Sequence, residues 1–391
     1  MADTLTNDHA AVLRQRRRAA AEARRLKTLN SIFELRAFIA LGVLIIVFAL
    51  LSDSFLTVDN LITMIKHVAI NAVLALGMLL VILKGGIDLS VGSIVGLSGV
   101  IAGELLQGVH LSLFGVIAYP PVWAVVILCI AAGTVMGSIN GLLITRLNVA
   151  PFIATLGMLY VARGAALLIS GGTTYPKLGG DPSTHNTGFD WIGGGRPLGL
   201  PVAIWIMIIL AAVVAVLLRS TPFGRWLYAT GGNERATELT GVPVQRVKVI
   251  VYMISGACAA MSGLIIASEL TSAAPQAGDS FELNAIAAVV IGGAALSGGR
   301  GNVRGTLVGA LVIGFLADGL VIVGVSTFWQ IFIKGTVIIV AVILDQTQQR
   351  FQRRGAAASA VAVVVADEPA TTDDEPAATD NAPVRPGTPA R

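Results

Sequence analysis

Ten long stretches of apolar residues succeed one another along this 391-residue chain, and they constrain its fold more than any other feature. A helix that crosses roughly 30 Å of hydrocarbon needs about 20 mostly apolar residues. Charged residues make up only 13% of the chain, against about 25% in soluble domains. The sequence therefore predicts an all-α membrane protein with about ten transmembrane helices, at 37–52, 61–83, 88–108, 121–141, 149–170, 199–218, 249–268, 283–297, 305–323 and 327–345.

The basic residues of the loops predict how these helices are oriented. Lys and Arg are concentrated in residues 1–36, in the loop 219–248 and after the last apolar stretch. Such residues favour the cytoplasmic side of a membrane. Ten crossings that start inside place all of these clusters on one face, and leave only Lys177 and Arg196 as basic residues on the other. We therefore expect both termini to be cytoplasmic.

Composition divides the chain into three parts. Residues 1–36 form a basic cytoplasmic segment, 37–346 form the transmembrane domain, and 347–391 form a cytoplasmic tail rich in Ala, Pro, Thr, Asp and Glu. Such a tail cannot bury a core, so we expect it to be largely disordered. The basic segment directly precedes an apolar stretch, which favours an anchor on membrane lipid over a nucleic-acid-binding patch.

The loop on the predicted cytoplasmic side contains a short helix signal. Asn233 suits the N-cap, Glu234 suits the first turn, and Gly241 suits the position just beyond the end. The helix would run over residues 234–240, and two turns are marginal in water. Glu234 and Glu238, four residues apart, repel each other slightly. Two interpretations stay open: a partner's surface holds this helix, or it is a surface turn packed on its own bundle.

A second stretch, residues 84–104, combines helix-breaking glycines with a carboxylate. Gly85 and Gly86 interrupt the helix, Ser90 and Gly92 belong to a small-residue face, and Asp88 lies in or near the membrane. A carboxylate at that depth is costly and suggests function. The alternative is that Asp88 caps the third helix in contact with water. The pattern G-G-x-x-L-S-x-G recurs at 292–299, which we interpret as a similar turn or chance and not as duplication.

Several kinds of function are missing from the sequence. It contains no P-loop motif, no chain of buried acids for ion coupling, and no Ser/His/Asp or metal-ligand cluster. We therefore expect no catalytic residue, no metal site and no cofactor in this chain, which is not an enzyme. A transporter without an energy source of its own must obtain one from a partner.

Five motifs, in a fixed order over about residues 37–346, resemble the permease subunits of bacterial ABC importers for monosaccharides, the ribose and xylose permease family. They are GGIDLSVGS (85–93), PFIATLGMLYVARG (151–164), FGRWLYATGGNERATELTGVPV (223–244), FELNAIAAVVIGG (281–293) and TFWQIFIKGTVIIVAVILD (327–345). The basic segment and the acidic tail depart from the family pattern.

The resemblance implies a division of labour in a bacterial inner membrane. A periplasmic or lipid-anchored binding protein delivers a monosaccharide or small polyol, two permease subunits form the path, and a separate ATPase binds ATP and Mg. The short helix would couple to that ATPase, through Asn233, Glu234, Ala236, Glu238, Leu239 and Gly241. The substrate path is expected at Gly85, Gly86, Asp88, Ser90, Gly92, Asn284, Gly292 and Gly293.

Two rival functions remain at this stage. One is an ion-coupled secondary sugar transporter or a channel that acts alone, and the other is a membrane scaffold without cargo. The sequence leaves open which sugar or polyol is carried, and whether the permease is a homodimer or a heterodimer.

Overall fold

The computed structural model describes residues 37–111, 116–180, 182, 186–343 and 346–347. All of them belong to one compact unit, Asn30–Gln349. The basic segment 1–36 and residues 348–391 of the tail lie outside the described residues, so their expected character stays a prediction.

Within the described residues, each of the ten apolar stretches contains a helix. Six of these helices are long and apolar enough to cross a membrane, which agrees with a multi-pass helical protein. The others are shorter, and the count of ten crossings and the side of the termini stay predictions. The six are α2 (Val58–Leu83), α4 (Val122–Arg146), α5 (Pro151–Ser170), α7 (Val202–Ser220), α10 (Val244–Glu269) and α12 (Val303–Ile322); the shorter ones are Ala37–Leu51, α3 (Val91–Gln107), α11 (Phe281–Ile291) and Thr327–Ile343.

The connections contain elements that the sequence did not predict. Strands β1 (Val109–Leu111) and β2 (Val116–Ala118) form an antiparallel hairpin with Val109 opposite Ala118. The sequence did not predict this hairpin, because three-residue strands are too short to show an alternating pattern. Helices α6 (Trp191–Gly194), α8 (Pro222–Gly232) and α9 (Glu234–Leu239) and the 3-10 turn η2 (Pro197–Gly199) complete the connections.

Proline begins many of these helices. Pro151 and Pro222 stand at the start of α5 and α8, while Pro121, Pro201 and Pro243 are the N-caps of α4, α7 and α10. The first N–H groups of a helix have no intrahelical partner, so proline loses nothing there and its fixed φ suits the helix.

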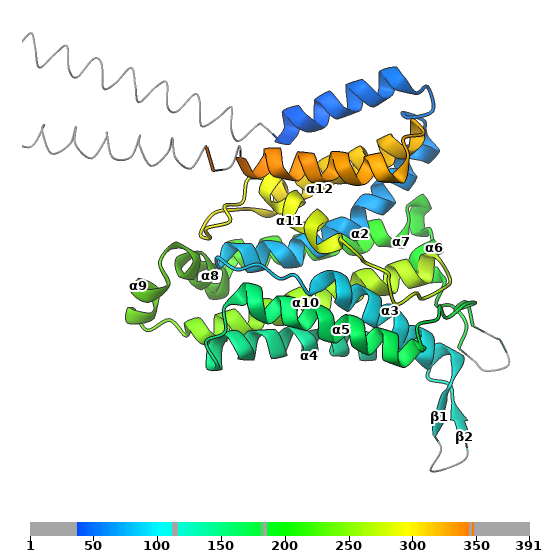
Figure 1. The fold of residues 1–391 in the computed structure, drawn as a ribbon, viewed down its shortest axis with the longest axis horizontal. Helices are drawn as coiled ribbons and strands as arrows, with labels where there is room; N and C mark the ends of the chain where they lie inside the picture. Colours follow the sequence, from blue (N-terminus) through cyan, green and yellow to red (C-terminus); the bar gives the residue numbers. More distant parts are fainter. Residues whose placement is uncertain (1–36, 112–115, 181, 183–185, 344–345, 348–391) are drawn as a thin grey trace, which may run out of the picture. The chain divides into compact units, whose positions relative to one another are not determined.

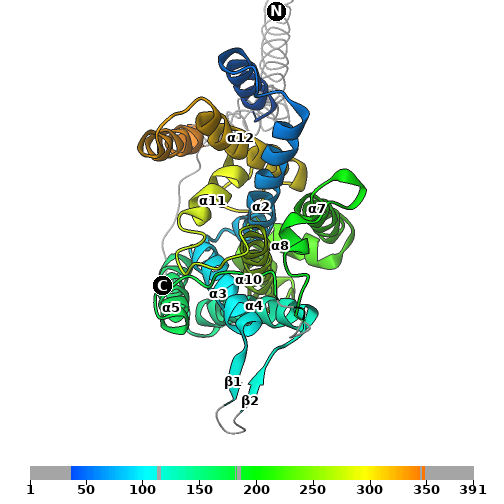
Figure 2. The same cartoon turned by 90° about the vertical axis from the view of Figure 1, so that its right-hand side faces the viewer.

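Helices α2 and α10 form the centre of the bundle (Figure 2). Helix α2 packs against α7, α10, α11 and α12, and α10 packs also against α3 and α4. Most of α2 is buried, whereas α4, α5 and α7 expose apolar side chains such as Leu168 and Val213. Apolar faces of this kind are expected on helices that contact lipid.

The two ends of the bundle differ in their connections. Figure 1 shows α8 and α9 at one end of the long helices, and β1, β2 and α6 at the other. With the predicted topology, the end with α8 and α9 is cytoplasmic.

Several ionisable residues within the helices form ion pairs or hydrogen bonds. Lys66 pairs with Glu269 at 2.6 Å, and His67 lies 3.2 Å from Asp318. Arg163 pairs with Asp279 and donates to the carbonyl oxygen of Ala277 at 3.2 Å. Arg163 therefore contacts both a carboxylate and a backbone carbonyl.

Candidate functional site

Helix α9 is built by local capping chemistry. The side-chain oxygen of Asn233 accepts a hydrogen bond from the Ala236 N–H at 3.0 Å, as expected of an N-cap. Beyond the helix, Gly241 has φ +83° and its N–H donates to the Glu238 carbonyl at 3.0 Å. The predicted start and end of this helix are therefore confirmed to within one residue.

The surface of α9 is mostly free within the described part of the chain. Ala236, Glu238 and Leu239 are exposed, and 81% of Leu239 is accessible. The one buried side chain is Thr237, whose hydroxyl donates to the Asn233 carbonyl at 2.8 Å. A helix of six residues thus presents an apolar side chain outward, as a docking element would.

Glu234 has a role that the sequence did not reveal. Its carboxylate forms an ion pair with Lys248, in the first turns of α10. Glu234 therefore links α9 to α10 although half of its side chain is accessible, and Glu238 is exposed as well.

At the end of the bundle that contains α8, glycines allow three backbone segments to meet: the end of α8, the end of α2, and the loop between α11 and α12. We call Gly85, Gly231, Gly298 and Gly299 the glycine junction. The N–H of Gly299 donates to the Leu83 carbonyl at 2.8 Å. A Cβ at Gly231 would lie 1.8 Å from that same oxygen, and a Cβ at Gly298 would lie 2.9 Å from the Gly85 nitrogen. Three backbone segments therefore meet without side chains between them.

A tyrosine reinforces the glycine junction from α8. The Tyr228 hydroxyl donates to the Gly301 carbonyl at 2.8 Å. Burial raises the pKa of Tyr228 above its ordinary value. The doublets Gly231–Gly232 and Gly298–Gly299 were the sequence signal for the junction, but nothing in the sequence paired them.

Asp88 and Ser90 are enclosed by protein. Asp88 has no exposed surface, so it does not cap a helix in contact with water. Its carboxylate accepts from the Ser90 N–H at 3.0 Å, from the Ser90 hydroxyl at 2.6 Å and from the Ser255 hydroxyl at 2.8 Å. The Asn140 amide donates to Ser90 at 2.9 Å. This network ties the start of α3 to α4 and α10, and a role for Asp88 in the substrate path stays a prediction.

The repeated glycine pattern corresponds to two similar helix ends. Gly85 follows α2 with φ +82°, and Gly293 follows α11 with φ +89°. In each case the N–H of the next residue donates a hydrogen bond to the carbonyl five residues earlier: Gly86 to Val81, and Ala294 to Val289. This is the Schellman ending that glycine permits. In the structure Gly85 is equivalent to Gly293, whereas the sequence pattern aligns Gly85 with Gly292. The repeated pattern therefore reflects two similar helix-ending turns.

The other predicted path residues lie elsewhere. Gly92 is on α3, where a Cβ would lie 2.5 Å from the Gly278 carbonyl oxygen, and Asn284 is half-buried in the first turn of α11. Gly292 packs against α12, since a Cβ there would lie 2.3 Å from the Gly305 carbonyl oxygen. Gly92 therefore lies beside the first turn of α11, which contains Asn284, whereas Gly292 and Gly293 follow the other end of α11.

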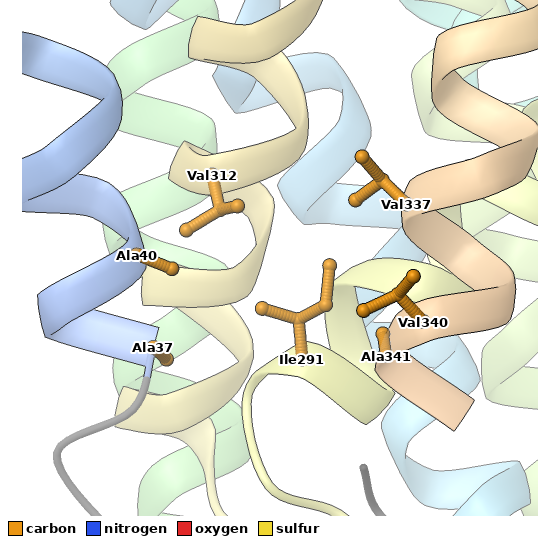
Figure 3. A pocket seen from close by; sticks show the side chains of 7 residues that line it. All are labelled: Ala37, Ala40, Ile291, Val312, Val337, Val340 and Ala341. Atoms are coloured by element: carbon orange, nitrogen blue, oxygen red, sulfur yellow. The ribbon is translucent and has the colours of Figure 1, made fainter. Parts of the chain in front are cut away.

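An apolar pocket near the chain's first described residues is unsuited to a polar solute. It lies between the helix Ala37–Leu51, the end of α11, α12 and the helix Thr327–Ile343 (Figure 3). Every residue that lines it is Ala, Val or Ile: Ala37, Ala40, Ile291, Val312, Val337, Val340 and Ala341. Such a lining offers no partner for hydroxyl groups.

Comparison with known proteins identifies the family. A family model described as the permease component of the branched-chain amino acid transport system matches residues 60–342. The chain belongs to this permease family. The resemblance drawn from the five motifs is confirmed at the level of ABC sugar permeases, because similar curated proteins are named as permeases for ribose or L-arabinose.

Three relatives illustrate the similarity. The ribose import permease protein RbsC of Bacillus subtilis is 46% identical over 314 residues, which cover 80% of this permease and 92% of the relative. RbsC of Escherichia coli K12 is 40% identical over 333 residues, 83% and 98% of the two chains. The L-arabinose ABC transporter permease protein AraH of Azospirillum brasilense is 35% identical over 315 residues, 80% and 88%. No solved structure gave a significant match to this permease.

Proposed function

We propose that this chain is the permease subunit of an ABC importer that passes a monosaccharide, such as the pentoses ribose or xylose, or a small polyol across the bacterial inner membrane. A separate ATPase that binds ATP and Mg drives it, and a periplasmic or lipid-anchored binding protein feeds it. A second permease subunit completes the path. The relatives named for ribose and arabinose import support the cargo class.

The observation that carries the proposal is the outward-facing α9. It is too short to be stable alone, it is capped by Asn233 and linked to α10 through Glu234, and it leaves Ala236, Glu238 and Leu239 exposed. This arrangement suits a helix that fits into a groove of the ATPase. No P-loop motif occurs in the chain, so the energy of ATP must come from outside it.

The glycine junction provides a route for movement away from α9. Helix α9 follows α8 directly, and the end of α8 contacts the backbone at Leu83 and at Gly299. A push on α9 would therefore reach the end of α2 and the loop between α11 and α12 through contacts without flexible side chains. In the proposed mechanism this movement tilts the helices between outward-open and inward-open states, and the sugar is not chemically changed.

The test is ATP-dependent sugar uptake by the full complex in proteoliposomes. Leu239→Asp places a charge on the docking face of α9, and we expect uptake and co-purification of the ATPase to fall by about tenfold or more. The matched control is Leu198→Asp, because Leu198 is 88% exposed but lies in the connection near α6, at the other end.

The outcomes separate the proposal from its rivals. Normal uptake by the Leu239→Asp variant would contradict the proposal. Sugar uptake by the permease with no ATPase present would favour a secondary transporter or a channel.

A further inference from the structure

Helix α11 spans only part of a membrane. Its 11 residues correspond to about 17 Å, roughly half of the hydrocarbon thickness. The preceding helix, α10, ends at Glu269 at the same end of the bundle as β1, β2 and α6 (Figure 1). The chain therefore covers the remaining depth as the irregular segment Leu270–Ser280, which we call the re-entrant segment.

The re-entrant segment runs along the glycine face of α3. A Cβ at Gly99 would lie 3.8 Å from the Ala273 Cβ, and a Cβ at Gly96 would lie 2.8 Å from the carbonyl oxygens of Pro275 and Ala277. Gly92 lies fifteen residues before the end of α3 at Gln107, which corresponds to about 22 Å. Because Gly278 reaches Gly92, the segment penetrates most of the length of α3.

Arg163 of α5 supports this non-helical backbone. Its guanidinium donates to the carbonyls of Pro275 and Ala277 and forms an ion pair with Asp279. Irregular backbone at membrane depth is tolerated only where protein buries it or where it lines a water-filled cavity. On its α3 side the segment is buried by protein.

The opposite side of the segment is polar and open. Gln276, Asp279 and Ser280 are exposed, with 63% of the Asp279 side chain accessible. Exposed amide, carboxylate and hydroxyl groups at this depth would be costly against lipid. We therefore expect this side of the segment to face water and not lipid.

We infer that the re-entrant segment lines the cargo path within the membrane, and that Gln276, Asp279 and Ser280 bind the hydroxyl groups of a neutral, polyhydroxylated solute. Amide, carboxylate and hydroxyl side chains together supply the donors and acceptors that such a solute needs. The Arg163 guanidinium is already paired with Asp279, and the carboxyl group of Glu282 lies nearby, so these residues do not favour an anion. Asn284, predicted from the sequence as a path residue, lies one turn beyond Ser280. The inference rests on the proposed function for its cargo.

The test uses single cysteines in the full transporter complex. The native Cys129 and Cys258 are buried, so they give little background. We compare Gln276→Cys in the segment, Leu198→Cys in an exposed connection, and Val213→Cys on the apolar exposed face of α7. The probe is a charged, membrane-impermeant methanethiosulfonate, with labelling read from protein mass and uptake measured with ribose.

The path assignment predicts a distinct result for each cysteine. Gln276→Cys should be labelled, and its uptake should then fall by about tenfold, because the adduct occupies the path. Leu198→Cys should be labelled with uptake unchanged, and Val213→Cys should stay unlabelled. The assignment is overturned if Gln276→Cys resists the reagent as Val213→Cys does, or if it is labelled without loss of uptake.

Labelling also separates this inference from the proposed function. The mass readout does not depend on transport. If the unmodified complex shows no ATP-dependent uptake, the proposed function fails, while labelling of Gln276→Cys still tests whether the segment faces water.

Discussion

At the scale of single residues, Asp88 shows how a fully buried carboxylate can serve the fold. Two serines supply all three of its hydrogen bonds, and one of them, Ser255, is 167 positions away. Sequence reasoning identified Asp88 as unusual because a charge there is costly. It could not identify the partner, since distant contacts depend on how α3 and α10 pack.

Two substitutions of Asp88 distinguish a role in the stability of the fold from a role in transport. Asp88→Ala leaves the Ser90 N–H without an acceptor, and we expect a loss of about 1–3 kcal/mol in stability, measured by thermal unfolding in detergent. Asp88→Asn keeps an acceptor for Ser90, and its amide can donate to the Ser255 hydroxyl, so it should retain both fold and ATP-dependent uptake. A stable Asp88→Asn protein with no uptake would instead indicate a direct role in the path.

At the scale of elements, the glycine junction can be tested with two adjacent glycines of α8. A Cβ at Gly231 would overlap Leu83 and Gly299, whereas one at Gly232 would meet nothing within 4 Å. We expect Gly231→Ala to cost about 1–3 kcal/mol through overpacking and to lower the sugar transported per ATP hydrolysed. Gly232→Ala should behave as the native protein in both assays. Equal coupling in the two variants would contradict a role for the junction.

The elements also show where sequence reasoning works. The ends of α9 were predicted because Asn233 and Gly241 act on neighbouring backbone groups, which the sequence displays directly. Helix α8 was missed because its three glycines weaken the helical signal. The junction was missed because its glycines lie far apart in the chain and meet only after folding.

At the scale of the whole molecule, hydropathy predicted the helices but not the depth of every segment. Residues 283–297 form one apolar stretch, yet α11 ends at Ile291, because Gly293 adopts a positive φ. Residues 271–280 fall between the predicted helices 249–268 and 283–297, and the structure places Ala273, Pro275, Ala277 and Gly278 of this stretch against α3. Hydropathy reports composition and cannot distinguish a loop outside the membrane from one packed within it.

The central claim is that α9 faces the cytoplasm and is held there by an ATPase. The most direct measurement is labelling of Leu239→Cys by an impermeant thiol reagent, in inverted and in right-side-out membrane vesicles. The account predicts labelling only in inverted vesicles stripped of the ATPase, and protection when the ATPase is added back. Labelling from the outside, or labelling that the ATPase leaves unchanged, would contradict it.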